Sequence, residues 1–366
     1  MTAHDAALLD PTSLAELLKR HSPFLRIYTL RRVADVGCAL ILAQSTRHVR
    51  LAPHLPGAAS LEAKKRRVER CLQDEQLDAE VFLCLLISLL PPGKLMLALD
   101  RTNWEHGEAD LNLLVLGVVL EGFTLPLVWT ALPHGGSSNT AARERLVAKL
   151  LKHLPAKRIK VLVADREFLG GDWFSFLRKR KIKRCIRIRL DTKVDDLRVD
   201  AAYKHVQPGQ VVGLLEKANV YGNVMQVVVT RTKDGELFAL ATDLKIWEAR
   251  TAYQLRFSVE CTFAALKSRG LGLEESHMTK ANRLERLFGL LTLAFACCLR
   301  VGVWRNGLKP IRRKKHGRRA VSVFRYGWEL LVNALRWALP DFQTYLALLS
   351  QPFPALGATG GEGVMY

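Results

Sequence analysis

Two compact apolar runs that each end on an aspartate constrain the fold of this chain most strongly. The first is KLMLALD, which ends at Asp100, and the second is IKVLVAD, which ends at Asp165. Runs this short and this apolar indicate β-strands buried on both faces, because a strand with one solvated face alternates apolar and polar residues. Such strands need helices on both sides of the sheet. The sequence therefore predicts an α/β fold with a mixed or parallel sheet.

The pattern of apolar and polar residues differs on either side of these two runs. Residues 1–92 have helical periodicity and end at a Pro-Pro-Gly break. The segments LNLLVLGVVL and FTLPLVWTAL predict a β-hairpin. Residues 191–235 contain alternating apolar and polar residues with YGN and KDG as turn signals, which predicts antiparallel strands. From about residue 276 the chain is helical again, and we expect the final GATGGEGVMY to be disordered.

Three acids in this pattern are candidate metal ligands. A single strand-end aspartate more often caps a turn or a helix, but reactive groups collect at the ends of buried strands because the strands hold them rigidly. A third acid, Glu260, follows on a predicted helix. Converging carboxylates repel one another unless a divalent metal neutralises them, and all-oxygen sites favour Mg²⁺ or Mn²⁺ over zinc. Two such ions about 4 Å apart activate water and stabilise a leaving 3′ oxygen in phosphodiester cleavage.

The segment YQLRFSVECTFAALK, residues 253–267, reads as one amphipathic helix. At about 100° per residue, four polar side chains fall within an arc of about 60° beside an apolar stripe. They are Tyr253, Arg256, Glu260 and Lys267. Each alone is more often a surface ion pair or a buried hydroxyl. Their alignment predicts that Glu260 faces the metal while its basic and phenolic neighbours contact a DNA strand.

The charge of the chain favours a polyanionic partner. Lys and Arg total 55 against 35 Asp and Glu, which gives a formal net charge of +20. Nucleic acid is the commonest partner of so basic a chain, an anionic membrane is a less common one, and a basic housekeeping enzyme is the alternative. Two acid-free basic runs, residues 178–189 and 300–319, suit phosphate contacts, although such runs are often only solvated surface.

The sequence predicts a cytoplasmic protein with no membrane partner. Its seven cysteines form no CxxC pair and lie in apolar runs, as expected for buried thiols in a reducing compartment. The first residues lack the hydrophobic core of a signal peptide. The longest uncharged apolar run, residues 287–299, is too short to span a bilayer.

The polar stripe and the segments around the aspartates resemble the DDE transposases of the insertion-sequence-four family. The YREK signature of that family matches the four stripe residues in identity and spacing, and LALDRTNW and VLVADREF match the segments around its two aspartates. The resemblance runs from about residue 95 to about residue 325. It implies a ribonuclease-H-like core, in which a mixed sheet has helices on both faces, with a β-strand insertion and helical N- and C-terminal flanks.

The resemblance also implies an activity. Members act as dimers that bind the terminal inverted repeats of a mobile element, cut with Mg²⁺, for which Mn²⁺ can substitute, and join the freed 3′ ends to target DNA. The catalytic residues and metal ligands would be Asp100, Asp165 and Glu260. The residues that position DNA would be Tyr253, Arg256 and Lys267. Such a protein would be bacterial and cytoplasmic, and nucleoid-associated when bound to DNA.

The resemblance assigns roles to the regions of the chain. They are a helical N-terminal DNA-binding region (1–92), the catalytic core (93–190 and 236–275), the β-rich insertion (191–235) and a helical C-terminal region with a basic segment (276–366).

Two features depart from the family pattern. Phe257 stands where the family often has Trp, and the insertion contains no Trp with which hairpin-forming relatives trap a flipped base. Trp247 lies nearby, but its place at the start of an amphipathic helix predicts a packing role. The hairpin step is therefore left open.

Two other functions fit part of the sequence. A ribonuclease-H-like nuclease would cut DNA without joining it, and a catalytically silent protein would bind DNA and regulate a mobile element. The three acids and the aligned stripe favour the transposase, since a protein that only binds DNA has no use for clustered carboxylates.

Overall fold

The computed structural model describes residues 11–213, 216–315 and 317–355, which form two compact units. The first unit contains the described residues up to Pro92, the segment Trp104–Leu111, and the described residues from Cys261 onward. The second contains Gly93–Asn103 and Asn112–Glu260. The tail for which we predict disorder lies outside the described residues, and the predicted domain boundaries remain predictions.

The first unit is mainly helical and includes the tip of one β-hairpin. Its helices near the N-terminus are α2 (Pro11–His21), α3 (Ile27–Ala43), α4 (His48–Leu51), the 3₁₀-helix η2 (Ala52–His54), α5 (Leu61–Gln73) and α6 (Ala79–Ile87). Its later helices are η5 (Leu273–Ser276), α12 (Ala281–Leu308), α13 (Val323–Arg336) and α14 (Asp341–Leu348). The helical flanks predicted from the sequence are therefore confirmed.

Helix α12 runs through the core of the first unit. By length and composition it is apolar enough to cross a membrane, but 78% of its apolar window is buried inside the structure, as in a core helix. It packs backbone to backbone on α13: a Cβ on Gly302 would lie 2.0 Å from the carbonyl oxygen of Val323, and a Cβ on Gly327 would lie 1.9 Å from that of Cys298. Only glycine permits this approach.

The second unit is built on a mixed sheet. Its first five strands are β1 (Leu95–His106), β2 (Ala109–Val119), β3 (Thr124–Ala131), β4 (Ile159–Ala164) and β5 (Arg184–Ile188). They lie in the order β3-β2-β1-β4-β5, with β4 parallel to β1 and β5, and with β2 antiparallel to β3. The tip of the β1–β2 hairpin belongs to the first unit.

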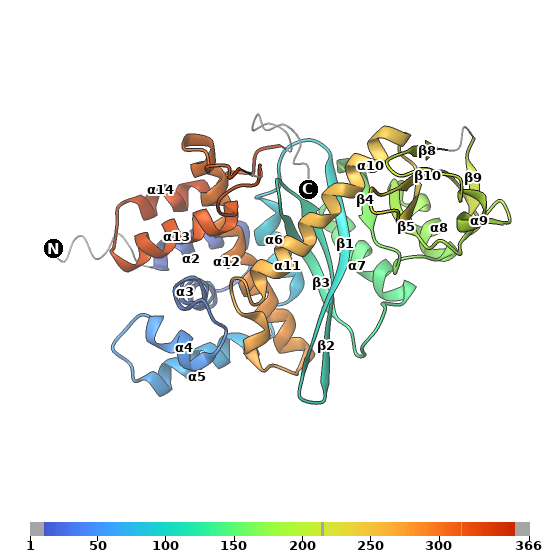
Figure 1. Cartoon of the computed structure of the whole chain (residues 1–366). Helices are drawn as coiled ribbons and strands as arrows, with labels where there is room; N and C mark the ends of the chain where they lie inside the picture. Colours follow the sequence, from blue (N-terminus) through green and yellow to red (C-terminus); the bar gives the residue numbers. More distant parts are fainter. Residues whose placement is uncertain (1–10, 214–215, 316, 356–366) are drawn as a thin grey trace. The chain divides into compact units, whose positions relative to one another are not determined.

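Helices cover both faces of this sheet (Figure 1). Helices α7 (Thr140–His153) and α8 (Gly171–Lys179) contact each other, and α7 also contacts β3, whereas α10 (Ile246–Gln254) contacts β4 and β5. The 3₁₀-helix η3 (Ala156–Arg158) leads into β4. The strand order and the helical layers confirm the predicted ribonuclease-H-like core.

The β-rich insertion continues the same sheet. Its elements are β6 (Lys193–Val194), β7 (Leu197–Arg198), α9 (Val199–Ala202), β8 (Val211–Gly213), β9 (Ala218–Val220) and β10 (Asn223–Arg231), and β11 (Leu237–Thr242) follows. β10 pairs antiparallel with β8, β9 and β11, which confirms the predicted antiparallel strands. β11 in turn pairs antiparallel with β5. The pairing covers the edge of β5, which would otherwise expose unpaired backbone groups.

The prediction of one continuous helix over residues 253–267 is wrong. Helix α10 ends at Gln254, a 3₁₀-turn η4 (Leu255–Phe257) follows, and α11 occupies Ser258–Leu266. A 3₁₀-turn advances by about 120° per residue, so three such residues rotate α11 by about 60° relative to an unbroken helix. The buried hydroxyl of Ser258 lies 2.7 Å from that of Thr124 on β3. This tertiary hydrogen bond fixes the start of α11 on the sheet.

Candidate active site

The two strand-end aspartates lie side by side. β1 and β4 are parallel neighbours and pair Leu99 with Ala164. The residue after each of these is an aspartate, Asp100 on β1 and Asp165 just beyond β4. Because parallel strands end at the same edge of a sheet, both carboxylates lie at that edge of the second unit.

Asp100 is held by two donors. Its Oδ1 accepts a hydrogen bond from the backbone N–H of Arg101 at 2.8 Å, and its Oδ2 accepts one from Nη1 of Arg256 at 2.7 Å. Burial raises the pKa of Asp100 to about 6, and the nearby acids Glu167 and Asp165 add to the rise while Arg256 opposes it. The carboxylate is thus costly to ionise without a cation beside it.

Asp165 is held in the same way. Its Oδ1 accepts hydrogen bonds from the backbone N–H of Arg166 at 2.8 Å and from the hydroxyl of Tyr253 at 3.1 Å. Burial, together with the neighbouring carboxylate, raises the pKa of Tyr253 well above its ordinary value, so the phenol stays protonated and keeps donating. The Tyr253 ring rests edge-on against Phe238 of β11, with centroids 5.0 Å apart.

Arg256 joins the strand acids to the helix acid. Its Nη1 contacts Asp100, and its Nη2 donates to Oε1 of Glu260 at 2.6 Å. Burial would lower the pKa of Arg256, but Tyr253 and the surrounding carboxylates raise it above its ordinary value, so it stays charged. Its Nε is buried and, among the described residues, has no hydrogen-bond partner. The Glu260 side chain is 46% exposed, so this acid is accessible from solvent.

Five of the six predicted site residues therefore meet within the second unit, and the sixth lies in the first. Lys267 follows the end of α11, and its Nζ lies 3.0 Å from Oε1 of Glu274. The same ammonium lies 5.1 Å from the ring centroid of Trp104, in cation–π geometry. Both partners belong to the first unit.

The donor set of the predicted triad fits a hard divalent cation. All three side chains offer carboxylate oxygens, the ligands that Mg²⁺ and Mn²⁺ prefer. In the described ranges, no group of three or more His, Cys, Asp or Glu lies close enough to hold one ion. The cation that now joins Asp100 to Glu260 is the guanidinium of Arg256.

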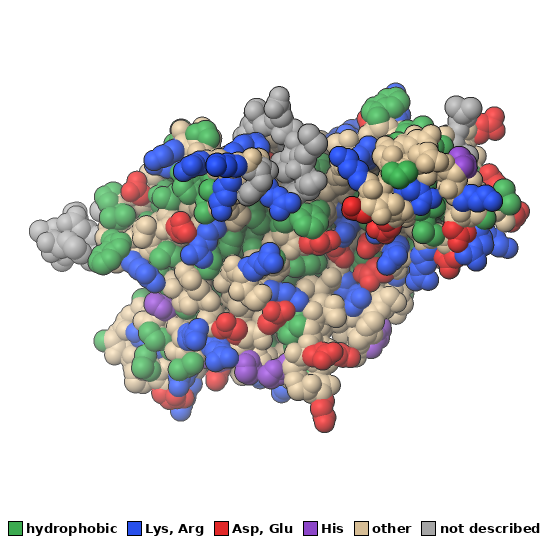
Figure 2. Space-filling view, in the orientation of Figure 1, with side chains coloured by type: hydrophobic (Ala, Val, Ile, Leu, Met, Phe, Trp, Pro, Cys, Tyr) green, Lys and Arg blue, Asp and Glu red, His purple; other side chains and the backbone are tan. Residues whose placement is uncertain are grey.

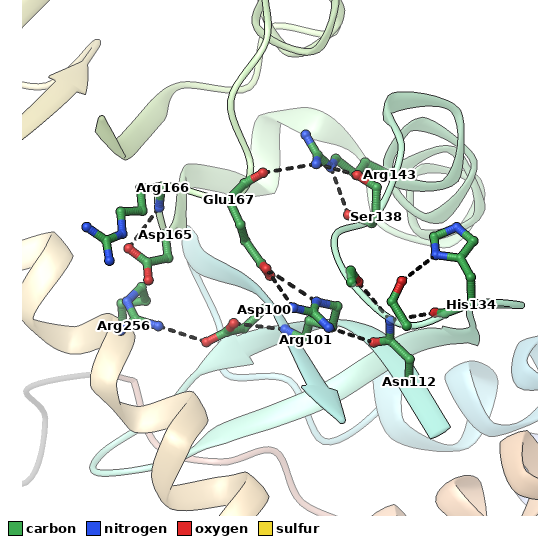
Figure 3. Close-up of polar contacts among 12 residues, drawn as sticks. Asp100, Arg101, Asn112, His134, Ser138, Arg143, Asp165, Arg166, Glu167 and Arg256 are labelled. Carbon is green, nitrogen blue, oxygen red and sulfur yellow. Dashed lines mark hydrogen bonds and ion pairs between the residues drawn. The ribbon is translucent and has the colours of Figure 1, made fainter. Parts of the chain in front are cut away.

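Sequence reasoning missed a polar network behind the two aspartates (Figure 3). Arg101 donates from Nη2 to Oε2 of Glu167 at 3.1 Å and from Nη1 to Oδ1 of Asn112 at 3.3 Å. The amide of Asn112 donates to the carbonyls of His134 and Gly136, at 3.0 and 2.9 Å. The network ties the two segments that carry the aspartates to the loop after β3. The sequence did hold a signal, since the basic Arg101 directly follows Asp100 and the acidic Glu167 lies two residues after Asp165.

A second cation completes this network from α7. The buried Arg143 donates from Nε to Oγ of Ser138 at 2.9 Å and from Nη2 to the backbone carbonyl of Glu167 at 3.0 Å (Figure 3). It also donates to the carbonyl of Leu169 at 3.2 Å and lies over the Phe168 ring. Arg143 therefore fixes the backbone of the loop that follows Asp165.

The prediction that whole basic runs contact phosphate is too broad. Within residues 178–189, Arg184 is buried and its guanidinium pairs with both oxygens of Asp243, at 2.7 and 2.8 Å. Within residues 300–319, Arg300 is buried and donates to the carbonyl of Gln351 at 3.3 Å. Sequence composition does not tell which basic side chains of a strand or helix point inward.

Exposed arginines line a cavity of the second unit instead. A cavity of about 520 Å³ is lined by Arg166, Arg189, Leu190, Asp191, Arg198 and Asp200. Arg166 directly follows Asp165, and Arg189 directly follows β5. Both side chains are exposed.

The prediction of a packing role for Trp247 is wrong. Its side chain is 67% exposed at the start of α10, where the ammonium of Lys245 lies 5.1 Å from its ring centroid. The first turn of this helix therefore presents the indole to solvent rather than to the sheet.

Three comparisons relate this chain to known proteins. A family model described as "Transposase DDE domain" matches residues 91–297. The solved synaptic complex of piggyBac transposase with hairpin DNA is similar over 94% of this chain and 82% of that chain, with 12% identity and a TM-score of 0.43. Endonuclease V from Bacillus subtilis is similar over 53% of this chain and 84% of that chain, with 10% identity and a TM-score of 0.26. The comparison with curated proteins found no match.

The family match covers more than half of the chain. It includes both strand-end aspartates, Glu260 and the three stripe residues around it. This chain belongs to the family of proteins with a transposase DDE domain.

Proposed function

We propose that this protein is a cut-and-paste DNA transposase that cleaves the ends of a mobile element and joins the freed 3′ ends to target DNA. The observation that supports this most directly is the cluster in the second unit. Two strand-end aspartates lie beside a tyrosine, an arginine and a glutamate from the segment that follows β11, and Arg256 contacts both Asp100 and Glu260. A protein that only binds DNA has no need of clustered acids around a partly buried guanidinium.

Asp100, Asp165 and Glu260 would hold Mg²⁺, for which Mn²⁺ can substitute. Bound there, divalent cations supply a water of lowered pKa and stabilise charge on the leaving 3′ oxygen. The partly buried Asp100 and the more exposed Glu260 suit this role, because one side of the site is fixed by the sheet and the other opens to the DNA.

Arg256 would hold the phosphate at the cleavage site. It is already fixed by carboxylates, it stays charged, and its buried Nε is a donor without a partner among the described residues. Tyr253 would orient Asp165 and contact the same strand. The exposed Arg166 and Arg189 of the second unit would bind neighbouring phosphates, and Lys267 of the first unit would also contact DNA.

The finer assignment is to the insertion-sequence-four family, on the YREK match of residues 253–267. Membership of this family implies that the protein acts as a homodimer bound to terminal inverted repeats. It also implies a bacterial cytoplasmic protein that is associated with the nucleoid when bound to DNA.

The direct test uses a plasmid that carries the gene with its natural flanking DNA. We expect Mg²⁺ to promote cleavage at both ends of the element and joining of the ends to a second plasmid, detected by sequencing the junctions. Glu260→Gln should abolish both reactions and leave DNA binding nearly intact. Glu216→Gln, which changes an exposed acid of the insertion, is the matched control.

The outcomes separate the candidate functions. Cleavage without joined product would indicate a nuclease rather than a transposase. DNA binding with no cleavage by the unsubstituted protein would indicate a regulator. Unchanged cutting by the Glu260→Gln protein would remove Glu260 from the catalytic set.

A further inference from the structure

The segment that links α12 to α13 carries a charge that the proposed chemistry does not use. It contains seven basic residues: Lys309, Arg312, Arg313, Lys314, Lys315, Arg318 and Arg319. The nearest acids in the sequence are Glu285 on one side and Glu329 on the other. A linker this basic would ordinarily be a flexible solvated loop.

This linker is instead an ordered two-stranded turn. The backbone N–H of Lys314 donates to the carbonyl of Arg318, and that of Ala320 donates to the carbonyl of Arg312, each at 2.8 Å. Arg313 and Arg319 form an antiparallel bridge between these bonds. Gly317 supplies the left-handed conformation that the turn requires, with φ of +83°. We name residues 309–315 and 317–320 the basic hairpin.

The basic hairpin is anchored to the helices on both sides. The backbone N–H of Ile311 donates to Oδ1 of Asn306 on α12 at 3.0 Å. The hydroxyl of Tyr326 on α13 lies 3.5 Å from the carbonyl oxygen of Lys309. The hairpin therefore has a defined orientation within the first unit.

Four cations of the basic hairpin carry the argument. Arg312, Arg313, Lys314 and Lys315 are all exposed, and no carboxylate of the described chain forms an ion pair with any of them. Figure 2 shows Lys and Arg side chains gathered on the face of the unit that carries α13 and α14. Adjacent like charges lie well within the screening length of about 8–10 Å, so holding them in one ordered turn costs free energy unless an anion neutralises them.

We propose that the basic hairpin binds the phosphate backbone of duplex DNA, at a surface made of residues other than those proposed for cleavage. A two-stranded ribbon is narrow enough to enter the major groove, and its row of cations would release condensed counterions from the duplex. Attachment to a membrane surface also needs apolar side chains that insert. The basic hairpin contains no large apolar side chain that is fully exposed, since its Ile311 is only half-exposed and its other apolar residues are Pro310 and Ala320.

The test measures binding of the full chain to a random-sequence duplex in the presence of a chelator, so that no cleavage occurs. The variant replaces Arg312, Arg313, Lys314 and Lys315 by Gln. Each phosphate contact contributes about −0.9 to the slope of log affinity against log salt. If all four cations contact phosphate, the variant should lose about 3.6 units of this slope between about 50 and 200 mM salt, and it should bind at least about tenfold more weakly at the low end.

The matched control removes the same charge elsewhere. It replaces four exposed lysines of the insertion by Gln: Lys193, Lys204, Lys217 and Lys233. The slope of this control should fall by less than one unit. Equal losses in both proteins would mean that net charge alone drives binding, and an unchanged slope in the hairpin variant would mean that the hairpin does not contact DNA. Either result overturns the proposal.

A second variant tests the ordered shape without changing any charge. Ala320→Pro removes the N–H that donates to Arg312, and with it one of the two bonds that close the hairpin. We expect weaker duplex binding at unchanged net charge, with circular dichroism used to verify that the helices remain. Duplex binding by this variant with the affinity of wild type would show that the ordered shape of the hairpin is not needed.

A loss of binding to anionic phospholipid vesicles with no loss for DNA would overturn the choice of partner. Both assays are independent of cleavage and joining.

Discussion

Arg256 donates from Nη1 to Oδ2 of Asp100 across 2.7 Å, and the other end of the same guanidinium reaches Oε1 of Glu260 at 2.6 Å. The oxygens that the proposed function assigns to a metal ion are therefore held by a side chain that it assigns to DNA. A guanidinium and a divalent cation compete for the same carboxylate oxygens. A DNA phosphate that draws Arg256 away would leave both acids free.

Metal binding and DNA binding should therefore strengthen each other. We expect duplex DNA to increase the affinity of the protein for Mn²⁺, measured by electron paramagnetic resonance, by about fivefold or more, which is within the usual range of coupling between sites. In the absence of DNA, the Arg256→Gln protein should bind Mn²⁺ more tightly than wild type, because the guanidinium that competes for the carboxylates is gone. Addition of DNA should then increase the Mn²⁺ affinity of this variant only slightly.

Two controls belong to this measurement. Arg250→Gln removes an exposed cation of α10 and should leave the coupling intact. A titration of the duplex without protein measures the Mn²⁺ that the DNA itself binds. Equal Mn²⁺ affinities for wild type with and without DNA would mean that Arg256 does not compete with the metal.

Asp100 should make the metal-free protein less stable as pH rises. Its pKa is raised by burial from 3.8 to about 6, so between these values the folded state binds a proton that the unfolded chain has released. Stability from this group is then greatest below about pH 4 and falls until about pH 6, by about 3 kcal/mol in all. In Asp100→Asn this component is absent.

Urea unfolding in chelator across this pH range measures the difference. The stability of Asp100→Asn relative to wild type should increase from pH 4 to pH 7. A constant offset between the two proteins would reflect only the lost contact with Arg256. Parallel pH profiles would therefore show that the carboxyl is not destabilised by its burial.

The ion pair of Arg101 and Glu167 should position the two aspartates. Its side chains are largely buried, and breaking one partner leaves a poorly solvated charge, which costs about 1–3 kcal/mol. We expect Arg101→Glu and Glu167→Arg each to lower stability and Mn²⁺ affinity. The double exchange should restore part of both, as urea unfolding and Mn²⁺ titration can measure.

A role in general packing predicts a different outcome. In that case the double exchange would be at least as damaging as the sum of the single changes, because two misfitting side chains would occupy the site. Partial rescue in Mn²⁺ affinity is the result that only a positioning role gives.

The strand-end aspartates could be found from the sequence because short apolar runs define buried strands and their ends. Asp100 and Asp165 each close such a run, and the parallel pairing of β1 with β4 brings them to one edge. The antiparallel strands of the insertion were also predictable, since alternation and turn residues are local signals.

What could not be predicted depends on tertiary contacts. The helix over residues 253–267 breaks at η4, and the hydrogen bond of Ser258 to Thr124 joins residues far apart in the chain. Arg184 lies in a basic run, yet it points inward to Asp243. From the sequence alone, the helix looks continuous and Arg184 looks exposed. The break in the helix and the burial of Arg184 both depend on packing against the sheet.

The contact between α12 and α13 gives a final prediction, with a control on the same helix. A Cβ on Gly302 would lie 2.0 Å from the carbonyl oxygen of Val323, whereas a Cβ on Gly307 would meet nothing within 4 Å. Gly302→Ala should therefore force the helices apart and destabilise the first unit by about 1–3 kcal/mol or more. Gly307→Ala should stabilise it by about 0.5–1 kcal/mol, because alanine favours helix. Thermal unfolding measures both, and equal effects of the two substitutions would contradict the close backbone contact.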